Sequence, residues 1–113
     1  MASKKIKKLL ISNRGEIACK IILCAKKLKI PTLAIYSDDD INSLHVQLAD
    51  EAVPVPGSLV SETYMNSSAI IKIAKKYKAN AIHPGYGLLS ENADFVELVE
   101  KNKLIFIGPK SQI

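Results

Sequence analysis

Two glycines flank a tyrosine in the segment His83-Pro84-Gly85-Tyr86-Gly87, which follows an apolar run and precedes a predicted helix. Glycine has no Cβ and reaches positive φ at little cost, so Gly85 and Gly87 allow the main chain to bend sharply and its amides to approach a bound group. Tyr86 would then lie at the rim of a binding site. A tight strand-to-helix turn whose glycines serve only the turn explains the same residues equally well, because short glycine motifs often match by chance.

The two histidines have different prospects for chemistry. His83 ends a predicted strand, so its imidazole could bond a backbone carbonyl to hold the turn or could titrate in a site, and we favour the first role. His45 lies on a short predicted helix with no cysteine or second ligand near it in sequence. We therefore predict no metal site.

A second polar segment, Asn13-Arg14-Gly15-Glu16, joins a predicted strand to a helix N-terminus. Exposed amides at such a junction could hold an anion, and Arg14 could add a bidentate contact. The segment lacks the full G-x-G-x-x-G pattern, which argues against a dinucleotide site. We favour a structural role in which Arg14 pairs with a carboxylate, either Glu16 or an aspartate of residues 37–40.

Acidic residues occur where carboxylates also have ordinary structural uses. Residues 37–40 (SDDD) follow a predicted strand, where an aspartate could bind ribose but more commonly serves loop and N-cap chemistry. Glu91 and Asp94 lie at a predicted helix start, where negative charge favours the positive end of the helix dipole. The sequence contains no phosphate-binding loop of the G-x-x-x-x-G-K-[ST] type, no nucleophile elbow and no H-E-x-x-H. We therefore assign no catalytic residue.

Strands and helices alternate along the chain. Apolar runs predict strands at residues 7–12, 32–36, 51–55, 79–83 and 104–107, and helical spacing predicts helices at 16–28, 43–48, 62–78 and from a cap at Ser90 or Asn92 to about 101. This order predicts an α/β fold, a Rossmann-like doubly wound parallel sheet of about five strands. The polar segments after the first, second and fourth strands would then lie on one rim, where such sheets bind ligands.

Length and composition limit the possibilities further. A chain of 113 residues is one domain at most, and its 48% hydrophobic content fits a soluble globular protein without a membrane span. The net charge of +5 comes mainly from lysine, and one arginine with six aromatic residues argues against nucleic-acid binding. No secretory signal is apparent. Cys19 and Cys24 are predicted to be buried free thiols, which suggests a reducing compartment.

Five motifs in order resemble the N-terminal domain of biotin carboxylases: 11–18 (ISNRGEIA), 34–38 (AIYSD), 48–52 (LADEA), 83–92 (HPGYGLLSEN) and 106–109 (FIGP). The resemblance covers nearly the whole chain. It implies a domain that precedes an ATP-grasp fold, in an enzyme that uses ATP, Mg²⁺ and bicarbonate to carboxylate biotin on a carrier domain, for a carboxyltransferase component. The residues that hold ATP and metal would lie past Ile113, so residues 1–113 would be one domain of a longer chain and inactive alone.

The resemblance also implies roles for individual residues. Tyr86 and Gly87 match positions that face the biotin ring, and His83, Pro84 and Gly85 shape their turn. The chain departs from the family pattern at Leu89, where a phenylalanine is usual, in residues 55–64, and at positions 23 and 27. Leucine and lysine stand there in place of an arginine and a glutamate that bacterial members use at a dimer contact.

Two expectations remain open from the sequence. The alternative to a carboxylase domain is a standalone module that uses the glycine turn to bind a small anion or a carrier domain. A domain separated from its ATP-grasp neighbour would also expose an apolar face, so we expect self-association or marginal stability.

The resemblance is compatible with a location in the cytoplasm or in the mitochondrial matrix, and the sequence does not choose between them.

Overall fold

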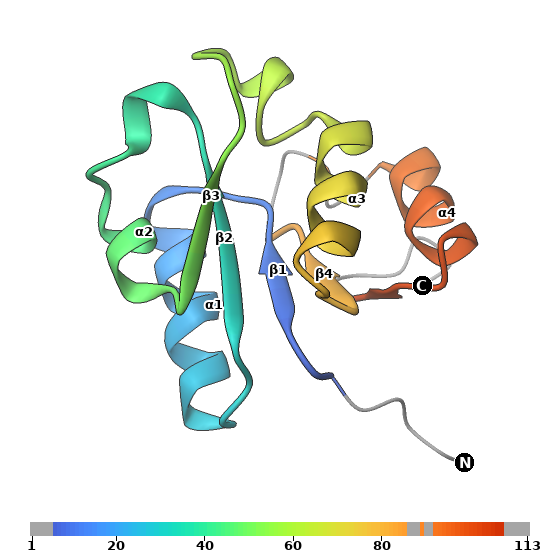
Figure 1. Ribbon diagram of the computed structural model, residues 1–113, viewed down its shortest axis with the longest axis horizontal. Coiled ribbons are helices and arrows are strands. Elements are labelled where there is room, and N and C mark those ends of the chain that lie inside the picture. Colours follow the sequence, from blue (N-terminus) through green and yellow to red (C-terminus); the bar gives the residue numbers. More distant parts are fainter. Residues whose placement is uncertain (1–5, 86–88, 90–91, 108–113) are drawn as a thin grey trace.

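The computed structural model describes residues 6–85, 89 and 92–107 of the chain (Figure 1). No helix in this part is long and apolar enough to cross a membrane. The elements, with η marking a short 3-10 helix, are β1 (Leu9–Ile11), α1 (Gly15–Lys27), β2 (Thr32–Tyr36), η1 (Asp38–Asp40), α2 (Leu44–Leu48), β3 (Glu51–Pro54), η2 (Val60–Glu62), α3 (Ser67–Lys76), β4 (Ala81–His83), α4 (Ala93–Lys101) and β5 (Ile105–Phe106).

The described strands form one five-stranded sheet in the order β3-β2-β1-β4-β5, and every pair is parallel. Leu10 at the centre of β1 is in register with Leu33 of β2 and Ile82 of β4. The chain first moves outward from β1 to β3 and then crosses to β4 on the other side of β1. The doubly wound α/β fold predicted from the alternating pattern is confirmed, and its topological switch point lies between β1 and β4.

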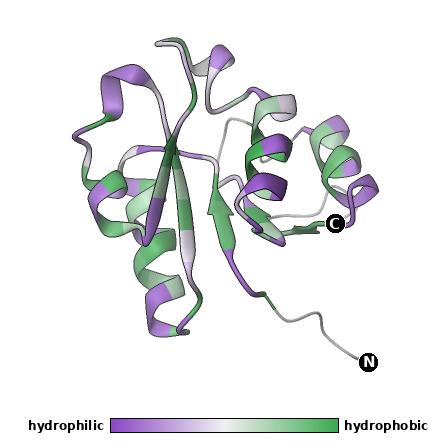
Figure 2. Ribbon diagram, viewed as in Figure 1, coloured by the Kyte–Doolittle hydropathy of each residue, from purple (hydrophilic) through white to green (hydrophobic). Residues whose placement is uncertain are grey.

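Successive residues of the central strands face opposite layers of helix, because side chains alternate across a sheet. Leu10 and Ile82 pack with α3 and α4 in one apolar core, whereas Leu9, Ile11 and Ala81 pack with α1 in the other. Strands buried on both sides read as continuous apolar runs, which Figure 2 shows as green along the middle of the sheet. The first core contains more large side chains than the second.

The second long helix begins later than its spacing predicts. Residues 62–78 were predicted to be one helix, but α3 starts at Ser67, and η2 and a turn precede it. The cause is Asn66, whose side chain accepts a hydrogen bond from the backbone of Ala69 (3.1 Å) and so caps the helix. Tyr64 therefore belongs to the turn before α3, where it is 1% exposed.

Three lysines occupy the left-handed conformation that usually selects glycine. Lys29, Lys78 and Lys103, with φ of 61°, 64° and 63°, each follow the end of a helix. At each end the next residue donates back across the last turn, as when Ala79 N–H bonds the Ala74 carbonyl at 2.8 Å. This is the Schellman arrangement, and a Cβ at its left-handed position is unfavourable.

We expect Lys78→Gly to raise the free energy of unfolding by about 0.5–1 kcal/mol, because glycine removes the Cβ strain at a left-handed position. The matched control is Lys72→Gly in the middle of α3, which should lower it by about the same amount. Urea denaturation of both variants measures the difference. If both substitutions changed the free energy of unfolding in the same direction, the left-handed conformation assigned to Lys78 at the end of α3 would be contradicted.

The two cysteines are free, as predicted, but they are not buried. Cys19 is partly exposed and Cys24 is exposed. Both lie on α1, whose buried residues are Ala18, Ile22 and Ala25. The prediction of buried thiols was wrong because the apolar stripe of α1 that contacts the sheet is narrow and both cysteines fall beside it.

Candidate functional site

The carboxyl ends of β1 and β4 lie side by side at the switch point of the sheet. The backbone N–H of Ser12, directly after β1, donates to the carbonyl oxygen of His83 at the end of β4 (3.1 Å). The two polar segments that the sequence marked, 13–16 and the turn after His83, therefore start from adjacent strands. Parallel sheets of this type bind ligands in the crevice outside the carboxyl ends of their strands.

Asn13 clamps the turn that follows β4. Its side-chain Nδ2 donates to the carbonyl oxygen of Pro84 (2.7 Å), and its Oδ1 accepts from the backbone N–H of Arg14 (2.8 Å). Gly85 has a φ of +76°, and a Cβ there would lie 2.6 Å from Asn13 Nδ2 and 2.8 Å from Ile17 Cγ2. Position 85 is therefore restricted to glycine both by its backbone conformation and by the close approach of the Asn13 and Ile17 side chains.

His83 holds the same turn through its ring. Its Nδ1 accepts a hydrogen bond from the backbone N–H of Gly85 (3.0 Å), so the neutral ring carries its proton on Nε2. The prediction that His83 bonds a backbone carbonyl was wrong. The ring bonds a backbone amide instead, because the Nδ1 lone pair of the neutral ring faces the Gly85 N–H in the turn. Burial lowers the pKa of His83 and favours the neutral form.

Asp40 is the centre of a buried polar cluster at the end of β2. It accepts two hydrogen bonds from Arg14, at Nε and Nη2 (both 2.8 Å), one from the Tyr64 hydroxyl (2.7 Å) and one from Ser37 Oγ (3.1 Å). The Tyr64 oxygen in turn accepts from the Ser37 backbone N–H (3.1 Å). The prediction that Arg14 pairs with a carboxylate is confirmed. Its partner is Asp40 and not Glu16, which lies on the exposed side of the α1 N-terminus.

The cluster fixes the charge state of its members. The hydrogen bonds from Arg14 hold the pKa of Asp40 well below its usual range, and the same contact raises the pKa of Arg14. Burial and the hydrogen bond to Asp40 raise the pKa of Tyr64 to about 12. Arg14 remains half-exposed, with 49% of its side chain accessible, at the edge of the rim. Because Asp40 neutralises this guanidinium, Arg14 is a weaker anion site than an unpaired arginine would be.

His45 is buried beside this cluster and contributes to structure. Its Nε2 lies 3.0 Å from the Ile35 carbonyl oxygen, and no described residue bonds its Nδ1. Desolvation lowers the pKa of His45 and favours the neutral ring in the folded protein. Among the described residues, no group of three or more His, Cys, Asp or Glu side chains could hold a metal ion.

The buried histidine makes stability depend on pH. A histidine in the unfolded chain has a pKa of about 6.5, whereas burial lowers the pKa of His45 in the folded protein. The unfolded state therefore binds more protons as the pH drops below about 6.5, and the free energy of unfolding should fall. Asp40 adds a second loss of stability as the pH falls through and below about 4, because its pKa is lower in the folded protein than in the unfolded chain.

We expect the free energy of unfolding of His45→Gln to fall less between about pH 7.5 and pH 5 than that of the original chain. Part of the loss should remain, because burial also lowers the pKa of His83. Urea unfolding of both proteins across this range is the measurement. An identical pH slope in the two proteins would show that His45 is protonated equally in the folded and unfolded states.

The remaining predicted site residues divide into two groups. Gly15, with φ of +69°, and Glu16 begin α1 and are exposed at the same edge as Asn13. Tyr86 and Gly87, predicted to face a ligand, lie outside the described residues, as does Glu91. Asn92 caps α4 through a hydrogen bond from Phe95 N–H (3.0 Å), which confirms one of the two predicted caps.

Sequence reasoning missed two contributors to the rim. Tyr64 was placed on a helix because its spacing fits one, and its role as a partner of Asp40 was not anticipated. Asn66 was the available signal, since an asparagine cap before two serines would have placed Tyr64 in the preceding turn. Asn13 was recognised only as part of a polar segment, and its contact with Pro84 spans 71 positions.

The described residues of the rim, which are 13–16, 37–40 and the start of the turn after His83, mainly hold backbone groups in position. Among them there is no nucleophile with an adjacent base. The polar groups of the rim pair mostly with one another, as Asp40 does with Arg14 and Tyr64. What it offers a ligand is the sharply bent main chain after β4, held between Asn13, Ile17 and His83. Such an arrangement can bind and orient a group at the end of the sheet.

Comparison with known proteins matches nearly the whole chain to one family. Residues 5–113 match the family described as "Biotin carboxylase, N-terminal domain". The chain is 51% identical over 108 residues to the mitochondrial methylcrotonoyl-CoA carboxylase subunit alpha of Dictyostelium discoideum, and 50% identical over 106 residues to biotin carboxylase 1 of Bacillus subtilis. These alignments cover 96% and 94% of the chain but only 16% and 24% of the relatives.

A solved structure agrees in fold. The biotin carboxylase domain of the Hydrogenobacter thermophilus 2-oxoglutarate carboxylase, in complex with MgADP, ADP and bicarbonate, superimposes with a TM-score of 0.89 at 45% identity. The match covers 95% of this chain and 23% of that one. The chain thus spans less than a quarter of the length of each of these proteins.

Proposed function

This chain belongs to the family of biotin carboxylase N-terminal domains, and we propose that it serves as the first domain of an ATP-dependent biotin carboxylase. The observation that carries the proposal is the family match over residues 5–113, joined to a rim whose buried contacts form at the matched motifs. In this proposal the parent chain continues past Ile113 into the ATP-grasp and C-terminal parts.

The parent enzyme would activate bicarbonate by phosphoryl transfer from ATP and transfer the carboxyl group to N1 of biotin. ATP and Mg²⁺ would be held by the later parts of the chain, because the described residues contain neither a phosphate-binding loop nor a metal-ligand group. This domain would contribute the turn after β4. Asn13 and His83 fix the start of that turn, and in this proposal Tyr86 and Gly87 would face the biotin ring.

Tyr86 provides the most direct test of this turn. An aromatic ring can pack on the ureido ring of biotin while nearby amides bond its polar edge. In the parent enzyme we expect Tyr86→Ala to raise the KM for biotin about tenfold and to change the KM for ATP less, since a lost aromatic contact is worth roughly 1–2 kcal/mol. Tyr77→Ala, on the far side of the sheet from α1, is the control. An unchanged KM for biotin would remove Tyr86 from the site.

The partners follow from the same proposal. A biotin carboxyl carrier would present biotin to the rim, and a carboxyltransferase component would use the product. The isolated 113-residue chain would be inactive. We place the parent in the cytoplasm or the mitochondrial matrix, because the relatives include a mitochondrial subunit and a bacterial enzyme.

The alternative is a standalone module that binds a small anion or a carrier domain without turnover. It rests on the same glycine turn and on the half-exposed Arg14. The pairing of Arg14 with Asp40 weighs against an anion site.

The length of the native polypeptide separates the two functions. An antibody raised against this domain should detect, in source cells, a band several times larger than 12.4 kDa. A band at the size of the domain itself would exclude the carboxylase and favour the module.

A further inference from the structure

Three turns that carry lysine meet at the amino-terminal end of the sheet, opposite the rim. The backbone N–H of Leu9 donates to the carbonyl oxygen of Pro31 (2.9 Å), in the turn after α1. Asn80, in the turn after α3, donates its N–H to the Lys8 carbonyl (3.1 Å), and its own carbonyl accepts from Ile105 (2.9 Å), which follows the turn after α4. The three turns therefore bring their left-handed residues to one edge of the domain: Lys29, Lys78 and Lys103.

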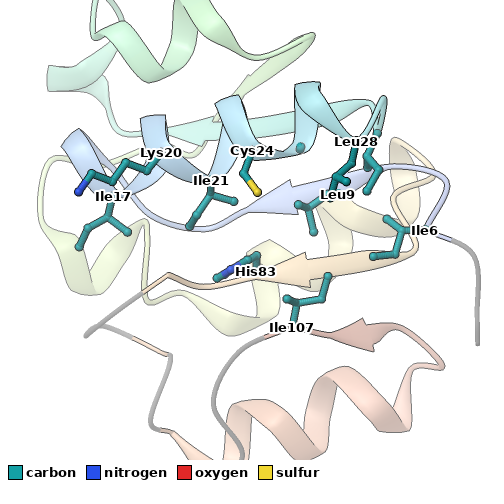
Figure 3. A pocket seen from close by; sticks show the side chains of 11 residues that line it. Ile6, Leu9, Ile17, Lys20, Ile21, Cys24, Leu28, His83 and Ile107 are labelled. Carbon is teal, nitrogen blue, oxygen red and sulfur yellow. The ribbon is translucent and has the colours of Figure 1, made fainter.

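The path of α1 shows the same arrangement. Leu28, at the end of this helix, and Ile6, just before β1, line one apolar hollow and lie together at one end of it (Figure 3). Lys20 and Ile17 lie toward the other end of α1, where the rim begins. The helices that connect parallel strands return antiparallel to them, so the ends of α3 and α4 come to the same edge as the end of α1.

We call Lys7, Lys29, Lys78 and Lys103 the basic edge. All four are exposed, and no carboxylate in the part of the chain that the structure describes forms an ion pair with any of them. The last turns of α1, α3 and α4 add two, two and one further lysines around them. Positive charge is thus concentrated at this end of the strands, whereas the one arginine of the chain, Arg14, lies on the rim and is paired with Asp40.

The backbone of three of these lysines indicates that their charge has a use. A glycine at Lys29, Lys78 or Lys103 would remove the Cβ strain of the positive φ. The helix dipoles do not require a lysine there, because lysines in the last turns already lie at the negative ends of the same three helices. Residues that break a local conformational rule without a local gain are expected at functional positions.

Lysine side chains suit a partner whose negative charge is spread over a surface. An ammonium group is a compact point charge on a flexible stem, whereas recognition of a single phosphate or carboxylate favours arginine, whose planar guanidinium donates two hydrogen bonds at once. Interfaces between proteins are depleted in lysine and enriched in arginine and aromatic residues. A bilayer that contains anionic lipids presents a diffuse negative surface, and each lysine near it adds to the attraction.

We propose that the basic edge holds the protein against the surface of an anionic lipid bilayer. The contact is peripheral, and no described helix is long and apolar enough to cross the membrane. Because the basic edge and the rim lie at opposite ends of the strands, the rim would face away from the bilayer. The exposed acidic residues of the rim, Glu16, Asp38 and Asp39, would be repelled by the same surface and favour this orientation. The inference does not depend on the proposed function.

The test is sedimentation of the native polypeptide that carries this domain with vesicles of phosphatidylcholine, with and without phosphatidylserine. We expect binding to the anionic vesicles alone, and a decline in binding as sodium chloride is added. In the variant Lys78→Gly/Lys103→Gly binding should weaken at least about tenfold. Both substitutions relieve left-handed strain, so the fold is retained, which urea denaturation of the variant checks.

Lys20→Gln/Lys72→Gln is the matched control, because it removes the same two charges from exposed positions away from the basic edge. It should weaken binding by less than about threefold. Equal losses in the two variants would overturn the inference, because net charge and not the basic edge would then decide binding. Equal binding to neutral vesicles, or no binding to either kind, would also overturn it, and so would binding of a DNA duplex in place of the vesicles.

A separate assay judges the proposed function in the same preparations. Release of phosphate from ATP that depends on biotin and bicarbonate is measured without vesicles. A polypeptide that binds anionic vesicles through the basic edge but releases no phosphate would support this inference and contradict the proposed function. An active polypeptide that binds no vesicles would do the reverse.

Discussion

Replacing Gly85 with alanine is expected to lower the free energy of unfolding by about 2–5 kcal/mol. The backbone at Gly85 has a φ of +76°, which costs an alanine roughly 1–2 kcal/mol. The new Cβ would also lie 2.6 Å from Asn13 Nδ2 and 2.8 Å from Ile17 Cγ2, and relief of such overlap adds roughly 1–3 kcal/mol. In the parent enzyme the same change should displace the turn that carries Tyr86 and lower kcat/KM for biotin.

Gly15→Ala is a matched control for this prediction. Gly15 also has a positive φ, of +69°, but a Cβ there would meet nothing within 4 Å. The backbone strain is therefore common to both variants, and the difference between them isolates the contact with Asn13 and Ile17. Urea denaturation of both proteins measures that difference. Equal losses of stability would mean that the β4 turn does not pack against Asn13 as described.

Asp40→Ala should lower the free energy of unfolding by about 2–6 kcal/mol. The substitution leaves the buried Tyr64 hydroxyl and Ser37 without their acceptor, and unsatisfied buried groups cost roughly 1–3 kcal/mol each. The lost pair with Arg14 contributes less, because half of that side chain is exposed to water. The exposed Asp39 next to it gives the control, and Asp39→Ala should change stability by less than about 0.5 kcal/mol.

A double-mutant cycle identifies the main source of this loss. Tyr64→Phe removes the hydroxyl that Asp40 accepts from, so the combined Asp40→Ala/Tyr64→Phe variant should lose less stability than the two single losses added together. Thermal or urea unfolding of the four proteins gives the coupling. Strictly additive losses would contradict the hydrogen bond between these two side chains.

The sheet and most helices could be predicted from the sequence because their signals are local. Strand β2 was predicted with its observed bounds, since Pro31 and the acidic run 37–40 delimit it. The start of α3 was misplaced because Tyr64 and the residues around it continue a helical apolar spacing. A single hydrogen bond from Ala69 to the Asn66 side chain overrides that spacing.

The contacts that build the rim were less accessible to sequence reasoning. Arg14 was expected to pair with a carboxylate, but four acidic residues were candidates, and only the fold selects Asp40. The contact of Asn13 with Pro84 depends on the pairing of β1 with β4, which are far apart in the chain. The partner of His83 has a similar origin, because the Gly85 amide is brought to the ring by a turn that Asn13 holds through the Pro84 carbonyl.

The central claim is that this chain is the first domain of a biotin carboxylase, and one measurement tests it most directly. The native polypeptide, captured from source cells with an antibody to this domain, is assayed for release of phosphate from ATP with and without biotin and bicarbonate. We expect release that requires bicarbonate and increases on addition of biotin. Release that is absent, or that is the same without either substrate, would contradict the assignment.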